Sequence, residues 1–466
     1  MHRLSWRREH CPEPTAPGGS LSGLAVLALL AGGAAGFVVA LFRLALDAAD
    51  RWRDALVADA HDAPVVGFVL TLTACAAAAA AAAALARRLA PYASGSGIPQ
   101  VEAALTGDLP AAPAQLVPVK FLGGLLAIGA GMALGREGPS VQMGAVLADL
   151  VGRLFRRGWS DLRILLAAGA GAGLAVAFNA PIAGAVFVLE ELVRRFEPRI
   201  AIAAIGASST AILISRLLLG PAPDFAVATA AAPGLYAAAA IWPLHIVLGA
   251  LAGIAAALYN RALIGLLALA DRLARFPAEA PAAAVGAVVG IVLWFAPSLA
   301  GGGDPITERV LAGRATLATL PLAFLLRFWL GPLCYAARTP GGLFAPLLVL
   351  GAQLGFFCGA LCHLLFPDLG IAPQAFAIIG MAAFFAGVVQ APVTGIVLVT
   401  EMTAAFTTLL PMLAACFAAM LTANLLKAAP IYDSLRERIL ASAGGGRTAT
   451  DPTASLPSSS RRAGEG

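Results

Sequence analysis

Long apolar runs constrain this chain more than any other feature, because each can cross a membrane as a helix. Examples are 21–46, 65–85, 282–300 and 409–426, and a transmembrane helix needs roughly 20 apolar residues. The chain of 466 residues is 60% hydrophobic and only 12% charged. A transmembrane β-barrel would instead show short segments of alternating polarity. The sequence therefore predicts an all-α polytopic membrane protein and excludes a soluble one.

Basic residues flank the apolar region at both ends of the chain. They are Arg3, Arg7 and Arg8 before the first run, and Arg436, Arg438, Arg461 and Arg462 after the last. Because arginine and lysine accumulate on the cytoplasmic side of membrane proteins, we expect both termini to be cytoplasmic. We interpret 1–20 as a cytoplasmic arm, 21–440 as the transmembrane domain and 441–466 as a disordered cytoplasmic tail.

The transmembrane region contains an internal repeat. "KFLGG" at 120–124 matches "RFWLG" at 327–331, and "GREGPSVQMG" at 135–144 matches "GLFAPLLVLG" at 342–351, both at an offset of 207. "APIAGAVFVLEE" at 180–191 matches "APVTGIVLVTEM" at 391–402, and "GSGIP" at 95–99 pairs loosely with "GGGDP" at 301–305. These matches predict two homologous halves, about 20–218 and 235–430. In transporters with such repeats, ion sites lie between the halves, at the ends of broken helices.

Two motifs are typical of helix starts that can bind an anion. "GSGIP" precedes the helical stretch "QVEAALTG" and offers the Ser96 hydroxyl together with free backbone N–H groups. "GLFAP" repeats this pattern, but Leu343 and Phe344 are apolar, so only their backbone N–H groups can face an ion. A tight loop with Ser96 as a simple N-cap is the alternative, and the motif alone leaves both interpretations open.

"GREGP" adds a carboxylate, Glu137, between Arg136 and Gly138. An ionisable residue inside a membrane is costly and is by default a functional candidate. An ionised Glu137 can occupy an anion site at a helix N-terminus, and a protonated one loses that attraction. A structural Arg136–Glu137 pair is the alternative, but adjacent residues on a helix point apart.

Two further carboxylates, Glu190 and Glu191, end an apolar run in "FVLEELVRRF". The simplest interpretation is a pair of i,i+4 salt bridges to the two arginines of this segment. The repeat distinguishes the two carboxylates, because Glu190 corresponds to Glu401 whereas Glu191 corresponds to Met402. A carboxylate present in both halves indicates a structural role, and one present in a single half is freer to be functional.

Tyr432 lies in "APIYDSL", directly after the last apolar run. Its phenol can donate to an anion, but periodicity alone favours an aromatic residue of the membrane interface. "AGAGAG" at 168–173 has no strand before it and no following G-K-[ST], so we interpret it as close helix packing and not as a nucleotide loop.

The motifs "GSGIP", "KFLGG", "GREGP", "GGLFAP" and "APVTGIVLVTEMT" resemble the CLC family of chloride channels and proton/chloride exchangers. The resemblance covers essentially residues 20–440 and is closest to short bacterial exchangers without CBS domains. It implies an inverted-repeat fold with broken, re-entrant helices around a central anion site. It also implies a homodimer in a bacterial inner membrane, with one anion pathway in each subunit.

The resemblance also implies roles for individual residues. Glu137 would be the external gate and proton acceptor, and Glu191 would transfer protons on the internal side. The anion-binding groups would be the hydroxyls of Ser96 and Tyr432 and the backbone N–H groups of Leu343, Phe344, Arg136 and Gly138. Gln100 departs from the family pattern, which favours an acidic residue after "GSGIP".

We therefore expect a proton-coupled chloride antiporter whose partners are chloride, protons and membrane lipid. A passive voltage- or pH-gated chloride channel of the same fold is the alternative. An intact "GSGIP" and Tyr432 disfavour a fluoride exporter, and a nitrate-preferring member would carry proline in place of Ser96. We expect no enzymatic activity, because no nucleophile–base pair, aspartate pair or metal-ligand spacing stands out. For the same reasons we expect no cofactor, no metal and no nucleic acid.

Overall fold

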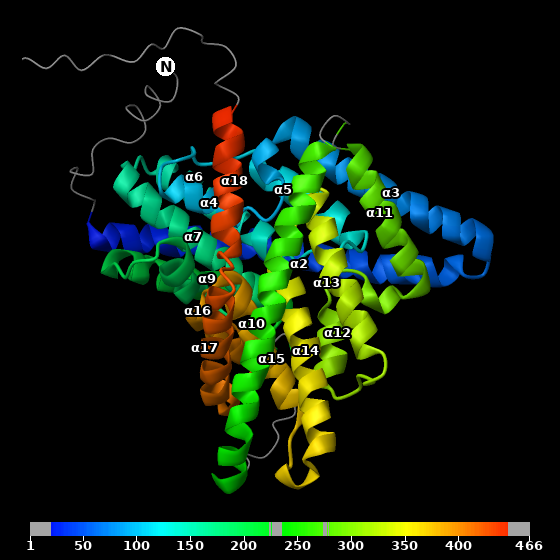
Figure 1. Cartoon of the computed structure of the whole chain (residues 1–466). Coiled ribbons are helices and arrows are strands. Elements are labelled where there is room, and N and C mark those ends of the chain that lie inside the picture. Colours follow the sequence, from blue (N-terminus) through cyan, green and yellow to red (C-terminus); the bar gives the residue numbers. More distant parts are fainter. Residues whose placement is uncertain (1–19, 223–224, 226–234, 274–276, 278, 446–466) are drawn as a thin grey trace, which may run out of the picture.

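The computed structural model describes residues 20–222, 225, 235–273, 277 and 279–445. These residues form 17 α-helices and no strands (Figure 1). Seven of the helices are long and apolar enough to cross a membrane. The all-α polytopic architecture expected from the apolar runs is thus confirmed. The expected arm before residue 20 and the tail after residue 445 lie outside the described residues.

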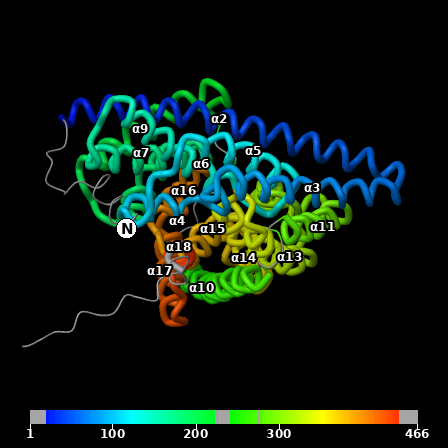
Figure 2. The backbone as a smooth tube through the Cα atoms, turned by 90° about the horizontal axis from the view of Figure 1, so that it is seen from above, coloured from blue at the N-terminus to red at the C-terminus, as the bar shows by residue number. Residues whose placement is uncertain are grey.

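The helices before residue 220 follow the order of the first group of motifs. They are α2 (Leu21–Ala60), α3 (Pro64–Leu89), α4 (Ile98–Leu105), α5 (Leu116–Gly129), α6 (Glu137–Leu154), α7 (Trp159–Phe178), α8 (Pro181–Phe187) with its π-helical extension η2 (Val188–Leu192), and α9 (Pro198–Leu219). Helix α2 lines one long edge of the molecule seen from above (Figure 2).

The remaining helices follow the second group of motifs. They are α10 (Leu235–Arg272), α11 (Glu279–Phe295), α12 (Asp304–Leu311), α13 (Leu320–Ala336), α14 (Phe344–Leu365), α15 (Pro373–Val389), α16 (Pro392–Thr403), α17 (Leu409–Leu425) and α18 (Ile431–Gly445). Helix α10 lies on the edge opposite α2 (Figure 2). Helix α18 continues past residue 440, where we expected the tail to begin. Helix starts correspond in the two groups: α4 with α12, α6 with α14, and α8 with α16.

Several helices begin inside the protein, where a glycine or proline ends the preceding segment and allows a new helix to start. Gly97 has a φ of 97° and directly precedes α4, and Pro99 lies in the first turn of that helix. Glycine adopts this left-handed backbone without steric cost, and proline fits the first helical turn. Helix α4 has only 8 residues, so it is about 12 Å long and cannot cross a membrane. Its N-terminus is therefore held within the protein.

Glycines bring the longest buried helices into backbone contact. Gly144 of α6 lies directly against the backbone of Gly169 in α7, and Gly351 of α14 lies against Gly380 in α15. Any side chain at these positions would overlap the neighbouring main chain. Small residues allow this close approach between membrane helices. The interpretation of "AGAGAG" as close helix packing is thus confirmed, and Gly144 and Gly351 also correspond in the repeat.

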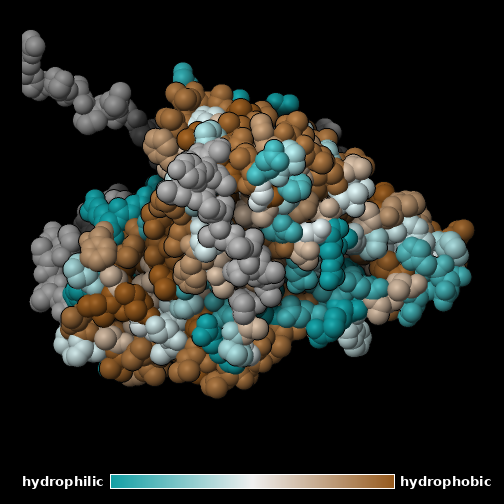
Figure 3. All heavy atoms as spheres, turned by 90° about the horizontal axis from the view of Figure 1, so that it is seen from below, coloured by the Kyte–Doolittle hydropathy of each residue, from teal (hydrophilic) through white to brown (hydrophobic). Residues whose placement is uncertain are grey.

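The outer surface of the helix bundle carries many large apolar side chains. Much of the face seen from below is apolar, with polar groups across its middle (Figure 3). Strongly exposed examples are Trp52, Val65, Phe196, Leu217, Phe417 and Leu425. A soluble protein rarely exposes so much apolar surface, and lipid is the solvent that such a surface fits.

Candidate functional site

The loops before α4, α6 and α14 are joined to one another by backbone hydrogen bonds. Gly135 and Gly342 exchange two of them, with N···O distances of 2.8 and 2.7 Å. The Gly95 N–H donates to Thr339 at 3.1 Å, and the Gly95 carbonyl accepts from Gly341 at 3.2 Å. Because loops from both groups of helices pair in this way, the N-termini of α4, α6 and α14 meet in the interior.

Two buried cations hold the loops that precede the short helices. The ammonium group of Lys120 donates to the carbonyls of Ala93 and Gly95, at 2.9 and 2.7 Å. The guanidinium of Arg327 donates to the carbonyls of Leu299, Gly301 and Gly302, at 3.2, 2.6 and 2.8 Å. Lys120 and Arg327 correspond in the repeat at the offset of 207, so each cation fixes the same loop in its own half.

Ser96 and Tyr432 are fully buried, and neither hydroxyl oxygen has a hydrogen-bond partner among the described residues. The Tyr432 ring stacks on the ring of Phe344, the first residue of α14, with centroids 5.9 Å apart. Gly138 packs directly on Ser96, where any side chain would overlap the serine. Buried hydroxyls normally have partners, so two unpaired ones beside helix N-termini leave donors available for an anion.

The buried position of Tyr432 corrects one interpretation based on the sequence. Periodicity favoured an aromatic residue at the membrane interface, but the side chain has no exposed surface and lies inside the protein. Helix α18 begins directly after Pro430 and packs on α4, and its Tyr432 ring stacks on Phe344 of α14. A residue that directly follows a span can therefore be buried when it opens a helix that packs on the interior.

Glu137 is the first residue of α6, and its side chain is 1% exposed. One carboxylate oxygen lies 3.4 Å from the backbone nitrogen of Ala345, in the first turn of α14. An anionic group is stabilised at this end of a helix by the free N–H groups and the helix dipole. The carboxylate thus lies where a small anion bound to the start of α14 would lie.

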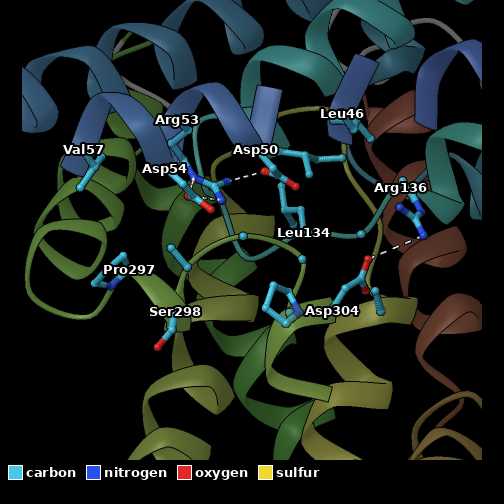
Figure 4. Close-up of a pocket in the computed structure, with 18 of the residues that line it drawn as sticks. Leu46, Asp50, Arg53, Asp54, Val57, Leu134, Arg136, Pro297, Ser298 and Asp304 are labelled. Carbon is cyan, nitrogen blue, oxygen red and sulfur yellow. Dashed lines mark hydrogen bonds and ion pairs between the residues drawn. The ribbon is translucent and has the colours of Figure 1, made fainter. Parts of the chain in front are cut away.

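A cavity of about 420 Å³ opens beside Glu137 and carries charges of both signs. Asp50, Arg53 and Asp54 project into it from α2, and Arg136 and Asp304 lie on its other side (Figure 4). The Arg136 guanidinium lies 3.6 Å from Asp304 and also contacts Asp47 at 3.7 Å. Its charge is therefore close to Asp304 of the cavity wall and to Asp47 of α2.

Glu191 lies beside a second cavity, of about 610 Å³, which it lines with Glu190 and Arg194. Its side chain is 3% exposed. Arg194 lies 3.5 Å from Glu191 and 2.8 Å from Asp433, the residue after Tyr432. The expected i,i+4 pairing is wrong for Arg194, because the helix ends as a π turn at Leu192 and Arg194 has a φ of 55°. The reversed backbone turns the arginine toward α18.

Glu190 has a different role from Glu191, as the repeat indicates. Its carboxylate accepts from the N–H groups of Val393 and Thr394, at 3.0 and 2.6 Å, in the first turn of α16. In return Glu401 of α16 accepts from the first turn of α8, where Ala183 donates at 2.8 Å. Each helix thus caps the N-terminus of the other, and a carboxylate found in both halves is structural.

A family model described as voltage gated chloride channel matches residues 78–424. The chain belongs to this family, the CLC family. It is 37% identical over 425 residues to the H(+)/Cl(-) exchange transporter ClcA of Vibrio parahaemolyticus serotype O3:K6, covering 89% of each chain. It is 39% identical over 366 residues to the ClcA of Vibrio cholerae serotype O1, covering 76% of each chain. It also resembles the crystal structure of a slow cyanobacterial Cl-/H+ antiporter, with a TM-score of 0.85 at 35% identity, covering 90% of this chain and 98% of that one.

Three polar residues of this CLC protein were missed in the sequence analysis although the structure places them near the site. Glu102 of α4 is buried, both of its carboxylate oxygens lack a hydrogen-bond partner among the described residues, and α4 packs on the η2 turn that carries Glu191. Lys120 and Asp433 are the others. An acidic residue in a short apolar helix was a detectable signal for Glu102. The unusual Gln100 donates to the Ser94 carbonyl at 3.2 Å and so braces the same loop.

Proposed function

We propose that this CLC protein is a proton-coupled chloride antiporter that exchanges chloride for protons through a gated anion pathway. One observation carries the proposal: two buried carboxylates, Glu137 and Glu191, line two different cavities. Tyr432, with its unpaired hydroxyl, connects the two regions, because its ring stacks on Phe344 at the start of α14 and the next residue, Asp433, contacts Arg194 beside Glu191. The exchange transporters named above share this chain's family and most of its length, which supports the same function here.

In the proposed mechanism a central chloride is held by neutral donors only. The hydroxyls of Ser96 and Tyr432 face it, and the backbone N–H groups of Leu343 and Phe344 complete the site at the start of α14. Such dipoles replace part of the hydration shell of chloride without a full positive charge, so the ion can also leave. The N–H groups of Arg136 and Gly138, at the start of α6, hold chloride on the outer side.

Glu137 then serves as both gate and proton acceptor. While ionised, its carboxylate lies against the Ala345 N–H, beside the start of its own helix α6, and excludes chloride from the outer position. Protonation removes its charge and with it the attraction to the helix N-terminus, so the side chain withdraws and chloride enters. Glu191 supplies and receives protons on the other side. Because one position holds either the carboxylate or chloride, the two ions must alternate.

We also propose that two copies assemble as a homodimer in a bacterial inner membrane, with both termini in the cytoplasm. An apolar face formed by α8, α9, α16 and α17 supports the dimer. These helices pack on one another, and their exposed side chains include Ile182, Leu213, Leu217, Leu413 and Phe417. Each chain contains a full set of site residues, so each subunit would transport separately.

The test compares three carboxylate variants in proteoliposomes, with chloride flux and pH recorded together. Glu137→Gln imitates the protonated gate, so chloride should still move while chloride-driven proton movement disappears. Glu191→Gln should also abolish proton movement, because the inner proton donor is lost. Glu401→Gln is the matched control, since this carboxylate only caps α8, and its proton coupling should persist. Chloride flux through the wild-type protein without any proton movement would show a passive channel instead.

A further inference from the structure

A second phenol, that of Tyr335, lies at the Ser96 loop. Tyr335 is near the C-terminal end of α13 and its side chain is buried. Its hydroxyl oxygen accepts from the backbone N–H of Ser96, with an N···O distance of 3.4 Å. The same oxygen lies against Gly95, only 3.2 Å from where a side chain at that position would begin. The phenol thus contacts the backbone of both residues that open the "GSGIP" motif.

The hydrogen of this phenol has no acceptor among the described residues. A tyrosine hydroxyl both donates and accepts, and the bond from Ser96 uses only its acceptor side. The hydroxyls of Ser96 and Tyr432 are also unpaired. Tyr432 stacks on Phe344 at the start of α14, and the loop before that helix is hydrogen-bonded to Gly95 beside Ser96. Three buried hydroxyl donors therefore share one region without a protein acceptor, which is costly unless an acceptor enters with a ligand.

Comparison of the two halves indicates that Tyr335 is not part of the duplicated scaffold. At the offset that relates Lys120 to Arg327, the residue corresponding to Tyr335 is Ile128, which has no hydroxyl. The positions that hold the loops of each half in place carry similar groups in both halves, as the two buried cations show. A phenol present in one half, at the loop that carries Ser96, is thus not required by the duplicated architecture.

We propose that Tyr335 is a third hydroxyl ligand of the transported anion and favours chloride over larger, weakly hydrated anions. The inference rests on the proposed function, because it requires chloride beside Ser96. Each further hydroxyl donor replaces water around the ion. A small anion loses more hydration energy on entering the site, so an added donor favours chloride over an ion such as thiocyanate.

The test is Tyr335→Phe, which removes one oxygen and retains the ring. Calorimetric titration of the full chain in detergent should show chloride binding about tenfold weaker, as expected for one lost hydrogen bond to an ion. Thiocyanate binding should weaken less, so the preference for chloride should fall severalfold. Tyr259→Phe is the matched control. This tyrosine is fully buried with an unpaired hydroxyl, but its ring packs on Phe328 and Phe384 and its oxygen lies against Gly331 of α13, not against the Ser96 loop, so both affinities should stay unchanged.

Two further measurements make each outcome decisive. Thermal unfolding without chloride shows whether Tyr335→Phe folds like the wild type, and Ser96→Ala tests the anion site itself. Equal weakening of both anions, or unchanged chloride affinity in a folded Tyr335→Phe protein, overturns the third-ligand assignment. If Ser96→Ala weakens chloride binding while Tyr335→Phe does not, only this inference fails. If the wild-type protein binds no chloride, the proposed function fails as well.

Discussion

Replacing Lys120 by methionine should weaken chloride binding, although the lysine is not itself proposed as a ligand of the ion. The ammonium group is fully buried and donates to the carbonyls of Ala93 and Gly95. Both carbonyls belong to the loop that ends at Ser96. Methionine fills a similar volume but donates no hydrogen bond, so the loop would lose the group that holds its two carbonyls in place.

The size of the effect follows from those two bonds. A buried acceptor left without a donor costs about 1–3 kcal/mol, so two carbonyls give an upper range of about 2–6 kcal/mol. Part of this loss is offset, because the variant no longer has to bury a charged ammonium group when it folds. We expect the free energy of unfolding to fall by about 1–4 kcal/mol. The chloride affinity should fall as well, because the Ser96 hydroxyl loses its fixed position.

Arg327→Met is the matched control, because the repeat supplies the same device at another loop. Its guanidinium holds the loop that includes Gly301 and Gly302, which borders the cavity beside Glu137 and does not contain Ser96. Both variants should unfold at lower temperature than the wild type in detergent. Only Lys120→Met should weaken chloride binding in calorimetric titration. Wild-type chloride affinity in a folded Lys120→Met protein would refute the idea that this lysine positions the serine.

Two further predictions concern the scaffold. Glu190→Ala and Glu401→Ala should each lower stability by about 1–2 kcal/mol in thermal or denaturant unfolding, the usual cost of a lost helix cap; two variants as stable as the wild type would contradict reciprocal capping. Gly97→Ala should abolish chloride binding or folding. The backbone at this position is left-handed, which alanine rarely adopts, and the added methyl group would overlap Gln142. Gly33→Ala, with open space around the new methyl group, should express and bind chloride normally, and equal behaviour of the two alanine variants would disprove the steric argument.

Much of the fold could be predicted from local chemistry. Apolar runs predicted the long helices, and "GSGIP" and "GLFAP" predicted interior helix starts, because glycine, proline and helix geometry act over a few residues. The same reasoning placed Ser96 and Phe344 at helix N-termini. It also gave Glu190 a structural role, since a repeat compares two positions under the same fold.

Contacts between distant segments could not be predicted in this way. Periodicity placed Tyr432 at the interface, because the packing of α18 on α4 and of this ring on Phe344 depends on the arrangement of the whole domain. Arg194 was paired with neighbours in a continuous helix, whereas the structure ends that helix early and turns the arginine to Asp433. Lys120 was used only as a repeat marker, because its partners are backbone carbonyls that no side-chain pattern reveals.

The comparison of the two halves separates support from chemistry in this protein. The groups that hold loops and helices occur twice: Lys120 with Arg327, Glu190 with Glu401, and Gly135 paired directly with Gly342. The side chains proposed to handle ions occur once. Position 137 carries a carboxylate where its counterpart is Phe344, and Glu191 and Tyr335 also lack polar counterparts. A duplicated scaffold can place two helix N-termini against each other by symmetry, but exchange of two different ions requires two different groups there. The single-half residues break that symmetry, so they are the positions at which substitution should change transport before it changes stability.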